Sequence, residues 1–364
     1  MLALLTAGMV AASALLSSPL RAEEVQGFQP RISLLPKQVE ILRKTLRNDS
    51  AAGRAFEPVK KLAERALGEK PHPVKKIVSE GRLYSDPEKK QSLQARHDLP
   101  KTEALGYAYA LSGKTEYGEK AREFVLAWAR LYDPDGNPIN ETEFIGLMKA
   151  YDLTRVLFTD RQRSEVGQWL LRMAEKQKAA VRPTSSTSKN NHHSHALKII
   201  GHAAFLLPNP ELIRWAVADY KRHLNVNLSP DGSTFDFHQR DALYYHVYDL
   251  LPLIELAIAT DKNGIDLYTY TTPQGANLEK SIAFLIPYIT GEKVHREFVH
   301  STVKFDLKRS RAGDPSIQVG EQWNPRKAKT LFDLAGYFQP RFHQVKFPGE
   351  DGALSFDRLL AACR

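Results

Sequence analysis

Cysteine is almost absent from this chain of 364 residues, which has only Cys363, close to its carboxyl terminus. One thiol forms no internal disulfide bond and supplies no cysteine-based metal site. Long apolar runs are also scarce. The most apolar segment, from Leu2 to Leu20, has an apolar core that is too short to favour a membrane span. The sequence therefore predicts neither a disulfide-stabilised fold nor a membrane-spanning protein.

Residues 1–22 instead have the pattern of a secretory signal peptide. The apolar run ends in Leu20-Arg21-Ala22, a small-residue cleavage pattern. A charged segment ahead of the run is missing, because Arg21 lies at its far end. We expect export to the periplasm and a mature chain of residues 23–364, long enough to bury a large core as a single domain.

Basic residues outnumber acidic ones. The formal net charge is +9, and +8 once residues 1–22 are removed. A basic excess attracts anionic partners such as nucleic acid, acidic glycans and anionic lipid head groups. Export favours the glycan, and dispersed basic residues without a recognised module disfavour nucleic acid. We therefore expect an anionic polysaccharide partner, with no nucleic acid and no membrane, while the oligomeric state stays open.

Apolar residues recur at helical spacing through most of the chain. Short breaks fall at Gly113, 133–136, 208–210 and 230–232, which leaves helices of about 12 to 20 residues. No strict repeat is present, so TPR-like and HEAT-like arrays are disfavoured. The pattern predicts an all-α fold, an incomplete (α/α) toroid of antiparallel helix pairs with a concave centre for a long polymer. The clearest helical stretches are 104–111, 121–128, 144–151, 166–173, 197–204, 213–220 and 243–254.

Two regions depart from this periodicity. Residues 68–100 are rich in proline and interleave basic with aromatic residues, among them Tyr84 and Arg96. They could form a lid over a groove for an anionic ligand, with Tyr84 and Arg96 touching that ligand, or a solvated connecting loop. After residue 290 the periodicity weakens, and residues 299–307 and 316–319 are expected to hold short strands.

The densest group of polar side chains follows a run of capping residues at 183–188. Such a run predicts a helix start, so this group should occupy the first turns of a helix. At about 100° per residue, Asn191, His192 and His195 fall within one arc of about 100°. The group reads Lys189-Asn190-Asn191-His192-His193-Ser194-His195.

A second group follows a turn at 230–233. On a continuous helix, His238, Asp241, Tyr245 and Tyr248 would share one face, and Arg240 and Tyr244 another. Tyrosines and histidines can also close a helix interface, which is the structural alternative. The segment reads Phe235-Asp236-Phe237-His238-Gln239-Arg240-Asp241-Ala242-Leu243-Tyr244-Tyr245-His246-Val247-Tyr248.

These two groups resemble the alginate-lyase-like polysaccharide lyases, an α/α toroid family that cleaves uronate polymers. The resemblance rests on the Asn190-Asn191-His192 element and on residues 231–253, and the matching order of helices covers nearly half of the chain. This chain departs from the family pattern at His193, since the element ends Ser194-His195. The working imidazole implied by the resemblance is therefore either His192 or His195.

The resemblance implies β-elimination, in which the proton on C5 of a uronate is removed and the oxygen on C4 departs. The sugar carboxylate opposes the carbanion, so hydrogen-bond donors or cations must neutralise it. Suitable residues are Asn191, Arg240 and one histidine of the first group. Alginate is the first candidate substrate and a glucuronan-like polymer the second.

A tyrosine would move the protons. Tyr245, with Tyr244 as the alternate, can act as acid and base if a nearby positive charge lowers its pKa. A histidine can serve as base when the C5 proton lies on the opposite face of the sugar. We expect His238, Tyr244 and His246 to contact the substrate, and the reaction needs no metal or other cofactor.

Three alternatives compete with this hypothesis. His192 and His195, with His238 or His246 and Asp236 or Asp241, have ligand types suited to zinc. The same two aspartates could serve an α/α-toroid glycoside hydrolase. A periplasmic glycan-binding protein without turnover would also need a basic groove.

Overall fold

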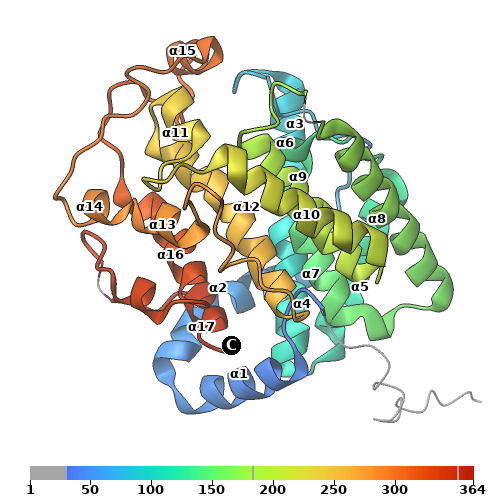
Figure 1. Cartoon of the computed structure of the whole chain (residues 1–364). Coiled ribbons are helices and arrows are strands. Elements are labelled where there is room, and N and C mark those ends of the chain that lie inside the picture. Colours follow the sequence, from blue (N-terminus) through green and yellow to red (C-terminus); the bar gives the residue numbers. More distant parts are fainter. Residues whose placement is uncertain (1–30, 183, 351) are drawn as a thin grey trace, which may run out of the picture.

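The computed structural model describes residues 31–182, 184–350 and 352–364, so the predicted signal peptide lies outside the described residues. The described part of the chain is helical and contains no β-strand; its only β pairing is three isolated bridges (Figure 1). The strands expected after residue 290 are therefore wrong. Lys304–Arg311 forms helix α15, and its basic last turn suits the negative end of the helix dipole.

Among the described residues, ten α-helices lie between Pro36 and Asn227. They are α1 (Pro36–Asn48), α2 (Ser50–Leu67), α3 (Pro87–Ala95), α4 (Asp98–Ser112), α5 (Thr115–Leu131), α6 (Pro138–Glu141), α7 (Ile145–Thr154), α8 (Asp160–Ala180), α9 (Asn191–Leu206) and α10 (Pro210–Asn227). All seven stretches with predicted helical spacing lie within helices, apart from the first residue of one, Phe144, which ends a 3-10 turn.

The second half contains shorter helices and more connecting loop. Its helices are α11 (Phe235–Arg240), α12 (Leu243–Asp261), α13 (Leu278–Ala283), α14 (Ile286–Ile289), α15, α16 (Lys329–Ala335) and α17 (Phe356–Ala361). Short 3-10 turns lie at η2 (Thr142–Phe144), η3 (Arg155–Leu157), η4 (Pro325–Ala328) and η5 (Pro340–Gln344).

Local sequence explains where the long helices begin and end. Asp49 caps α2 by accepting the backbone N–H groups of Ala51 and Ala52. Asn209 caps α10 in the same way, and Pro210 occupies its first position, where no N–H donor is needed. Helix α4 ends at Gly113, whose φ of 74° is open to glycine without strain.

The other long helices pack around α4 and α9. Helix α4 contacts α2, α5 and α7, and α9 contacts α8, α10 and α12. One hydrophobic core includes Ile199 and Ile200 of α9, and a second includes Leu197 of the same helix. The predicted incomplete α/α toroid is confirmed, with α9 joining its two cores (Figure 1).

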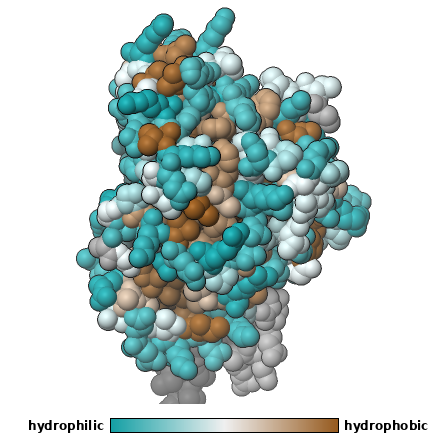
Figure 2. All heavy atoms as spheres, turned by 60° about the vertical axis from the view of Figure 1, so that its left-hand side comes forward, coloured by the Kyte–Doolittle hydropathy of each residue, from teal (hydrophilic) through white to brown (hydrophobic). Residues whose placement is uncertain are grey.

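No described helix is long and apolar enough to cross a membrane. The face in Figure 2 is mainly hydrophilic, and its hydrophobic patches are separated by polar side chains.

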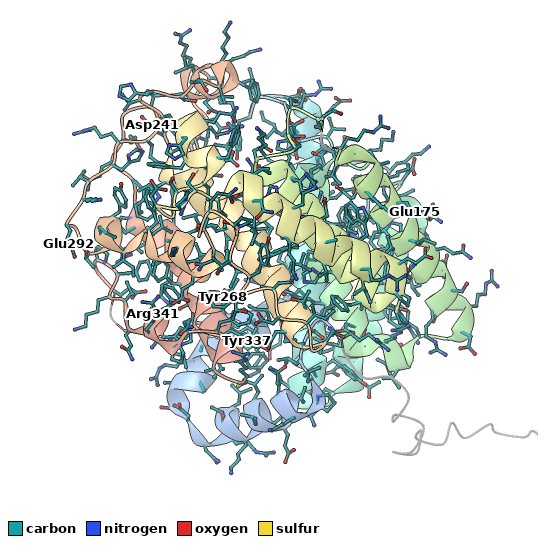
Figure 3. The ribbon with its side chains drawn as sticks, in the orientation of Figure 1. Glu175, Asp241, Tyr268, Glu292, Tyr337 and Arg341 are labelled. Carbon is teal, nitrogen blue, oxygen red and sulfur yellow. The ribbon has the colours of Figure 1, made fainter. Side chains whose placement is uncertain are left out.

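The start of the described chain is held by one buried carboxylate, that of Asp152 on α7. It accepts the backbone N–H groups of Arg31, Ile32 and Ser33 at 2.9–3.0 Å, and the Ser33 hydroxyl at 2.7 Å. Asp152→Ala leaves these donors without their acceptor, so we expect the free energy of unfolding to fall by about 2–3 kcal/mol. Urea unfolding measures the loss. Glu175→Ala, an exposed carboxylate on α8 (Figure 3), is the control and should change stability by less than about 0.5 kcal/mol.

Candidate active site

A cavity of about 370 Å³ opens where five parts of the chain meet. These are the segment 79–96, α6 with the 3-10 turn η2, the beginning of α9, the α11–α12 region, and α15 with the loop that follows it. Seven of the ten predicted site residues line the cavity: Tyr84, Arg96, Asn191, His192, Arg240, Tyr244 and Tyr245. His195, His238 and His246 lie elsewhere.

Helix α9 begins where the capping residues predicted a helix start. Asn190 is the cap, with its side-chain oxygen accepting the backbone N–H of His192 at 3.1 Å. Every residue of α9 is buried except His192. A helix buried on all sides normally presents apolar residues, so the one partly exposed imidazole at its first turn stands out as the group offered to the cavity.

Asn191 is oriented by Asp236, a fully buried residue of α11. One carboxylate oxygen of Asp236 accepts the backbone N–H of Asn191 at 2.6 Å, and the other accepts its side-chain amide at 2.7 Å. Burial raises the pKa of Asp236 to about 6, against the opposing effects of Arg240 and Asn191. One N–H of the Asn191 amide is thus committed to Asp236, and Asn191 lines the cavity.

The three imidazoles of the group point in different directions. His193 contacts Asp219 on α10 at 2.7 Å. His195 is buried, with its Nδ1 atom 2.7 Å from the Thr142 hydroxyl and its ring packed on Tyr248. It lines a neighbouring cavity of about 510 Å³ instead of the one that Asn191 and His192 line. The expectation that all three polar groups face one way is therefore wrong for His195, because that ring lies one turn deeper in the helix packing.

The second group does not form one continuous helix. Asp241, between α11 and α12, has a left-handed φ of 47° and ends α11, and Ala242 is extended (Figure 3). The predicted faces are therefore wrong for residues on opposite sides of the break, whereas Tyr245 and Tyr248 both lie on α12 and both line the cavity. The break folds Arg240 back onto Tyr245, whose ring centre lies 3.9 Å from the guanidinium carbon.

Arg240 is held by two carboxylates. It donates a hydrogen bond to Asp306 of α15, and its Nε atom lies 3.5 Å from Asp236. Asp236 therefore contacts both Asn191 and Arg240, so that one buried carboxylate ties the two sequence groups together.

Tyr245 is almost fully buried and receives a hydrogen bond from Arg309, at 3.0 Å. Burial raises the pKa of Tyr245 to about 12, even though Arg240 and Arg309 act to lower it. The condition set for this role, that a nearby positive charge lowers the pKa of the tyrosine, is not met overall, because burial outweighs both arginines. At neutral pH the hydroxyl keeps its proton.

The pKa of His192 is lowered, whereas that of Tyr245 is raised. Burial lowers its pKa below the ordinary 6.5, Arg240 lowers it further, and Glu80 on the opposite wall of the cavity raises it. The imidazole is therefore neutral at neutral pH and able to accept a proton.

His238 and His246, predicted to contact substrate, are placed in the structural framework instead. The ring of His238 lies 2.6 Å from the Ser233 hydroxyl. His246 is fully buried, between the Thr234 hydroxyl at 3.1 Å and the backbone oxygen of Ser281 at 2.9 Å. Neither lines the cavity: the break at Asp241 puts His238 on a different helix from Tyr245, and His246 is buried on α12.

The segment 68–100 supplies one wall of the cavity. The Asn140 side-chain oxygen accepts the backbone N–H groups of Ser79 and Glu80 at 3.1 and 3.0 Å, which fixes the segment beside α6. Tyr84 is 48% exposed, and Arg96 pairs with Glu143. The segment therefore lies at the cavity, as the lid hypothesis requires, and α3 makes part of it helical.

Several lining residues were missed from the sequence, notably Glu80, Lys89, Tyr248 and Arg309. Arg309 lies in the region where helical periodicity was weak, and a single arginine among many carries no signal of its own. Tyr248 was counted with the second group but given no role.

The positions of the proposed ligands do not support the zinc alternative. It required His238 or His246 beside His192 and His195, and these rings face other partners. Among the residues that the structure describes, no group of three or more histidine, cysteine, aspartate or glutamate side chains could hold a metal ion.

The fold and cavity define a class: a helical toroid with an amide, an imidazole, an arginine and a tyrosine gathered in a basic cleft. The sequence profile of the alginate lyase family matches residues 45–295. The chain belongs to this family of polysaccharide lyases.

Known proteins resemble the chain at low identity. The exo-oligoalginate lyase of Saccharophagus degradans is 22% identical over 182 residues, which are 43% of this chain and only 24% of that protein. An alginate lyase structure from Bacteroides ovatus has a TM-score of 0.69 at 16% identity, covering 91% of this chain and 98% of its own. One from Sphingomonas species A1 has a TM-score of 0.62 at 19% identity, covering 94% and 99%. A variant of the latter enzyme has been solved with a tetrasaccharide.

Proposed function

We propose that the protein cleaves a uronate-containing polysaccharide by β-elimination, with alginate as the first candidate and a glucuronan-like polymer as the second. The observation that carries the proposal is the meeting of Asn191, His192, Arg240 and Tyr245 on one cavity, from two separate parts of the chain. Related proteins named as alginate lyases, and the tetrasaccharide bound by one of them, support the choice of substrate.

The sugar carboxylate binds to Asn191 and Arg240. The second N–H of the Asn191 amide donates to a carboxylate oxygen, and the Arg240 guanidinium supplies positive charge nearby. These groups stabilise the charge that develops when C5 loses its proton, and they are already in place because Asp236 holds both. Little reorganisation is then needed during the reaction.

His192 and Tyr245 divide the proton transfers. Neutral His192 takes the C5 proton, the electron pair of that bond forms the C4–C5 double bond, and the C4–O4 bond breaks. Tyr245 gives its proton to O4, so the leaving sugar departs as an alcohol. The imidazolium and the tyrosinate then exchange protons with solvent to restore the starting state.

The pKa shifts of these two groups predict a wide pH range of activity. His192 must be neutral, and its pKa is lowered from 6.5, so activity should rise with pH below that value and be complete by about neutral pH. Tyr245 must be protonated, and its pKa of about 12 keeps it so well into the alkaline range. Measuring kcat/KM against pH on a soluble uronate oligomer tests this. An acid limb centred above pH 7 would contradict the role of His192.

Hydrolysis by the predicted aspartate pair is not supported by the geometry. Asp236 is fully buried and occupied by Asn191, while Asp241 lies in the helix break and accepts the backbone N–H of His300. Neither lines the cavity, so no water could be activated there between them and a sugar.

Incubation of the purified protein with a panel of uronate polymers tests the proposal directly. Elimination creates an unsaturated sugar whose ultraviolet absorbance grows with time. Hydrolysis yields reducing ends without that absorbance, and this result would contradict the proposal.

A further inference from the structure

Arg309 makes one hydrogen bond with each of its three nitrogen positions. Its Nε atom donates to Asp314 at 2.9 Å, one terminal nitrogen donates to the Ser316 hydroxyl at 2.9 Å, and the other donates to the Tyr245 hydroxyl at 3.0 Å. Because the guanidinium is planar and rigid, three bonds to three separate groups fix its orientation completely. Asp314 and Ser316 therefore aim the third N–H at Tyr245.

This contact determines which way the Tyr245 proton points. The Tyr245 oxygen accepts from Arg309, and among the contacts of the described residues this is the one hydrogen bond that the hydroxyl makes. Its own proton is therefore not used on the arginine side. Since Tyr245 lines the cavity, the proton is left for an acceptor that enters it.

The two arginines beside Tyr245 make different contacts. Arg240 lies over the face of the ring, at 3.9 Å from its centre, and donates a hydrogen bond to Asp306. Arg309 instead donates to the oxygen that changes charge when Tyr245 loses its proton. A donor on that oxygen becomes a charge-assisted hydrogen bond once the tyrosinate forms, and such bonds are about twice as strong as neutral ones.

We propose that Arg309 is a positioning residue that directs the Tyr245 proton into the cavity and stabilises the tyrosinate left after the proton is given to O4. The role deepens the proposed function and depends on it for its catalytic meaning. The physical link between Arg309 and Tyr245 can be tested without substrate.

The charged and titratable groups around Tyr245 come from three helices. Arg240 belongs to α11, Asp306 and Arg309 to α15, and Tyr244 to α12. Arg240 and Arg309 favour the ionised tyrosine, whereas Asp306 and Tyr244 oppose it. Removing Arg309 therefore leaves one favourable charge instead of two, and ionisation should require a higher pH.

The test replaces tyrosine by a ring-fluorinated tyrosine, whose hydroxyl is more acidic and therefore ionises at an accessible pH. Fluorine NMR follows the ionisation, and the signal of residue 245 is assigned by its loss in Tyr245→Phe. We expect Arg309→Gln to raise the midpoint of this signal by about one pH unit or more. Arg311→Gln removes the same charge from an exposed position of the same helix and should leave it unchanged.

Arg309→Lys provides a second test in case the glutamine variant does not fold. It keeps the charge but cannot make all three contacts, so a smaller rise is expected. A midpoint for Arg309→Gln equal to that of Arg311→Gln overturns the proposal; if the glutamine variant does not fold, the same equality for Arg309→Lys does so.

Kinetics on a uronate oligomer form the second arm. Arg309→Gln should lower kcat by about 10- to 100-fold with little change in KM, and should cost nothing further in the Tyr245→Phe background. A raised KM with unchanged kcat would instead make Arg309 a binding contact and overturn the positioning role. Failure of the unaltered protein to cleave any polymer would defeat the proposed function, while the fluorine titration would still decide the link to Tyr245.

Discussion

Tyr245→Phe should lower kcat by about 10²- to 10⁴-fold on a uronate polymer, because the phenylalanine ring fills the same space but has no proton for O4. Substrate binding should be nearly unchanged, since Asn191 and Arg240 remain. Arg240 can still lie over the phenylalanine ring, so the site keeps its packing. Steady-state kinetics give kcat, and calorimetric titration of the inactive variant with polymer gives the affinity.

Two tyrosine variants control this result. Tyr270→Phe removes a hydroxyl that bonds to Asn225 away from the cavity, and it should leave kcat unchanged. Tyr244→Phe removes the neighbouring hydroxyl on the cavity wall and should have a smaller effect than Tyr245→Phe. If Tyr244→Phe abolishes turnover while Tyr245→Phe retains it, the proton donor has been assigned to the wrong residue.

His192→Ala and His195→Ala should have different effects, the first on catalysis and the second on stability. His192 lines the cavity and is the one unburied residue of α9, so its loss should reduce kcat by about 10²- to 10⁴-fold at nearly unchanged stability. His195→Ala leaves the buried Thr142 hydroxyl without its partner, so we expect a loss of about 1–3 kcal/mol in unfolding free energy.

Parallel kinetics and urea unfolding on the two variants separate these effects. The sequence alone left open which imidazole works. The structure favours His192, which is partly exposed and lines the same cavity as Tyr245, whereas His195 is buried and lines the neighbouring one. A stable His195→Ala protein without turnover, beside an active His192→Ala protein, would reverse the assignment.

Much of the fold was predictable because helical periodicity is a local property. The stretches of apolar spacing from residue 104 to 254 all coincide with helices, and the breaks at glycine and proline separate them. The region after residue 290 was not predictable in the same way. Its helix α15 is short and has mostly polar residues, so its packing against Arg240 and Tyr245 decides its structure.

The site was predictable in its composition and less so in its geometry. Residue types and spacing singled out Asn191, His192, Arg240 and Tyr245, which do line one cavity. The left-handed conformation of Asp241 was not visible in the sequence, because aspartate adopts it only where the surroundings hold it. That one residue ends α11, so that His238 and Tyr245 lie on different helices, and it brings Arg240 over Tyr245. His246 is buried on α12, where it contacts Thr234 and Ser281.

The central claim is that this cavity performs elimination, and one measurement tests it most directly. Purified protein is incubated with alginate and with a glucuronan-like polymer, and ultraviolet absorbance and product mass are followed together, with Tyr245→Phe as the matched control. We predict that absorbance rises with the unaltered protein on at least one polymer, that the products carry unsaturated ends, and that the control stays flat. Saturated products heavier by one water molecule, or an equal rise in the control, would contradict the account.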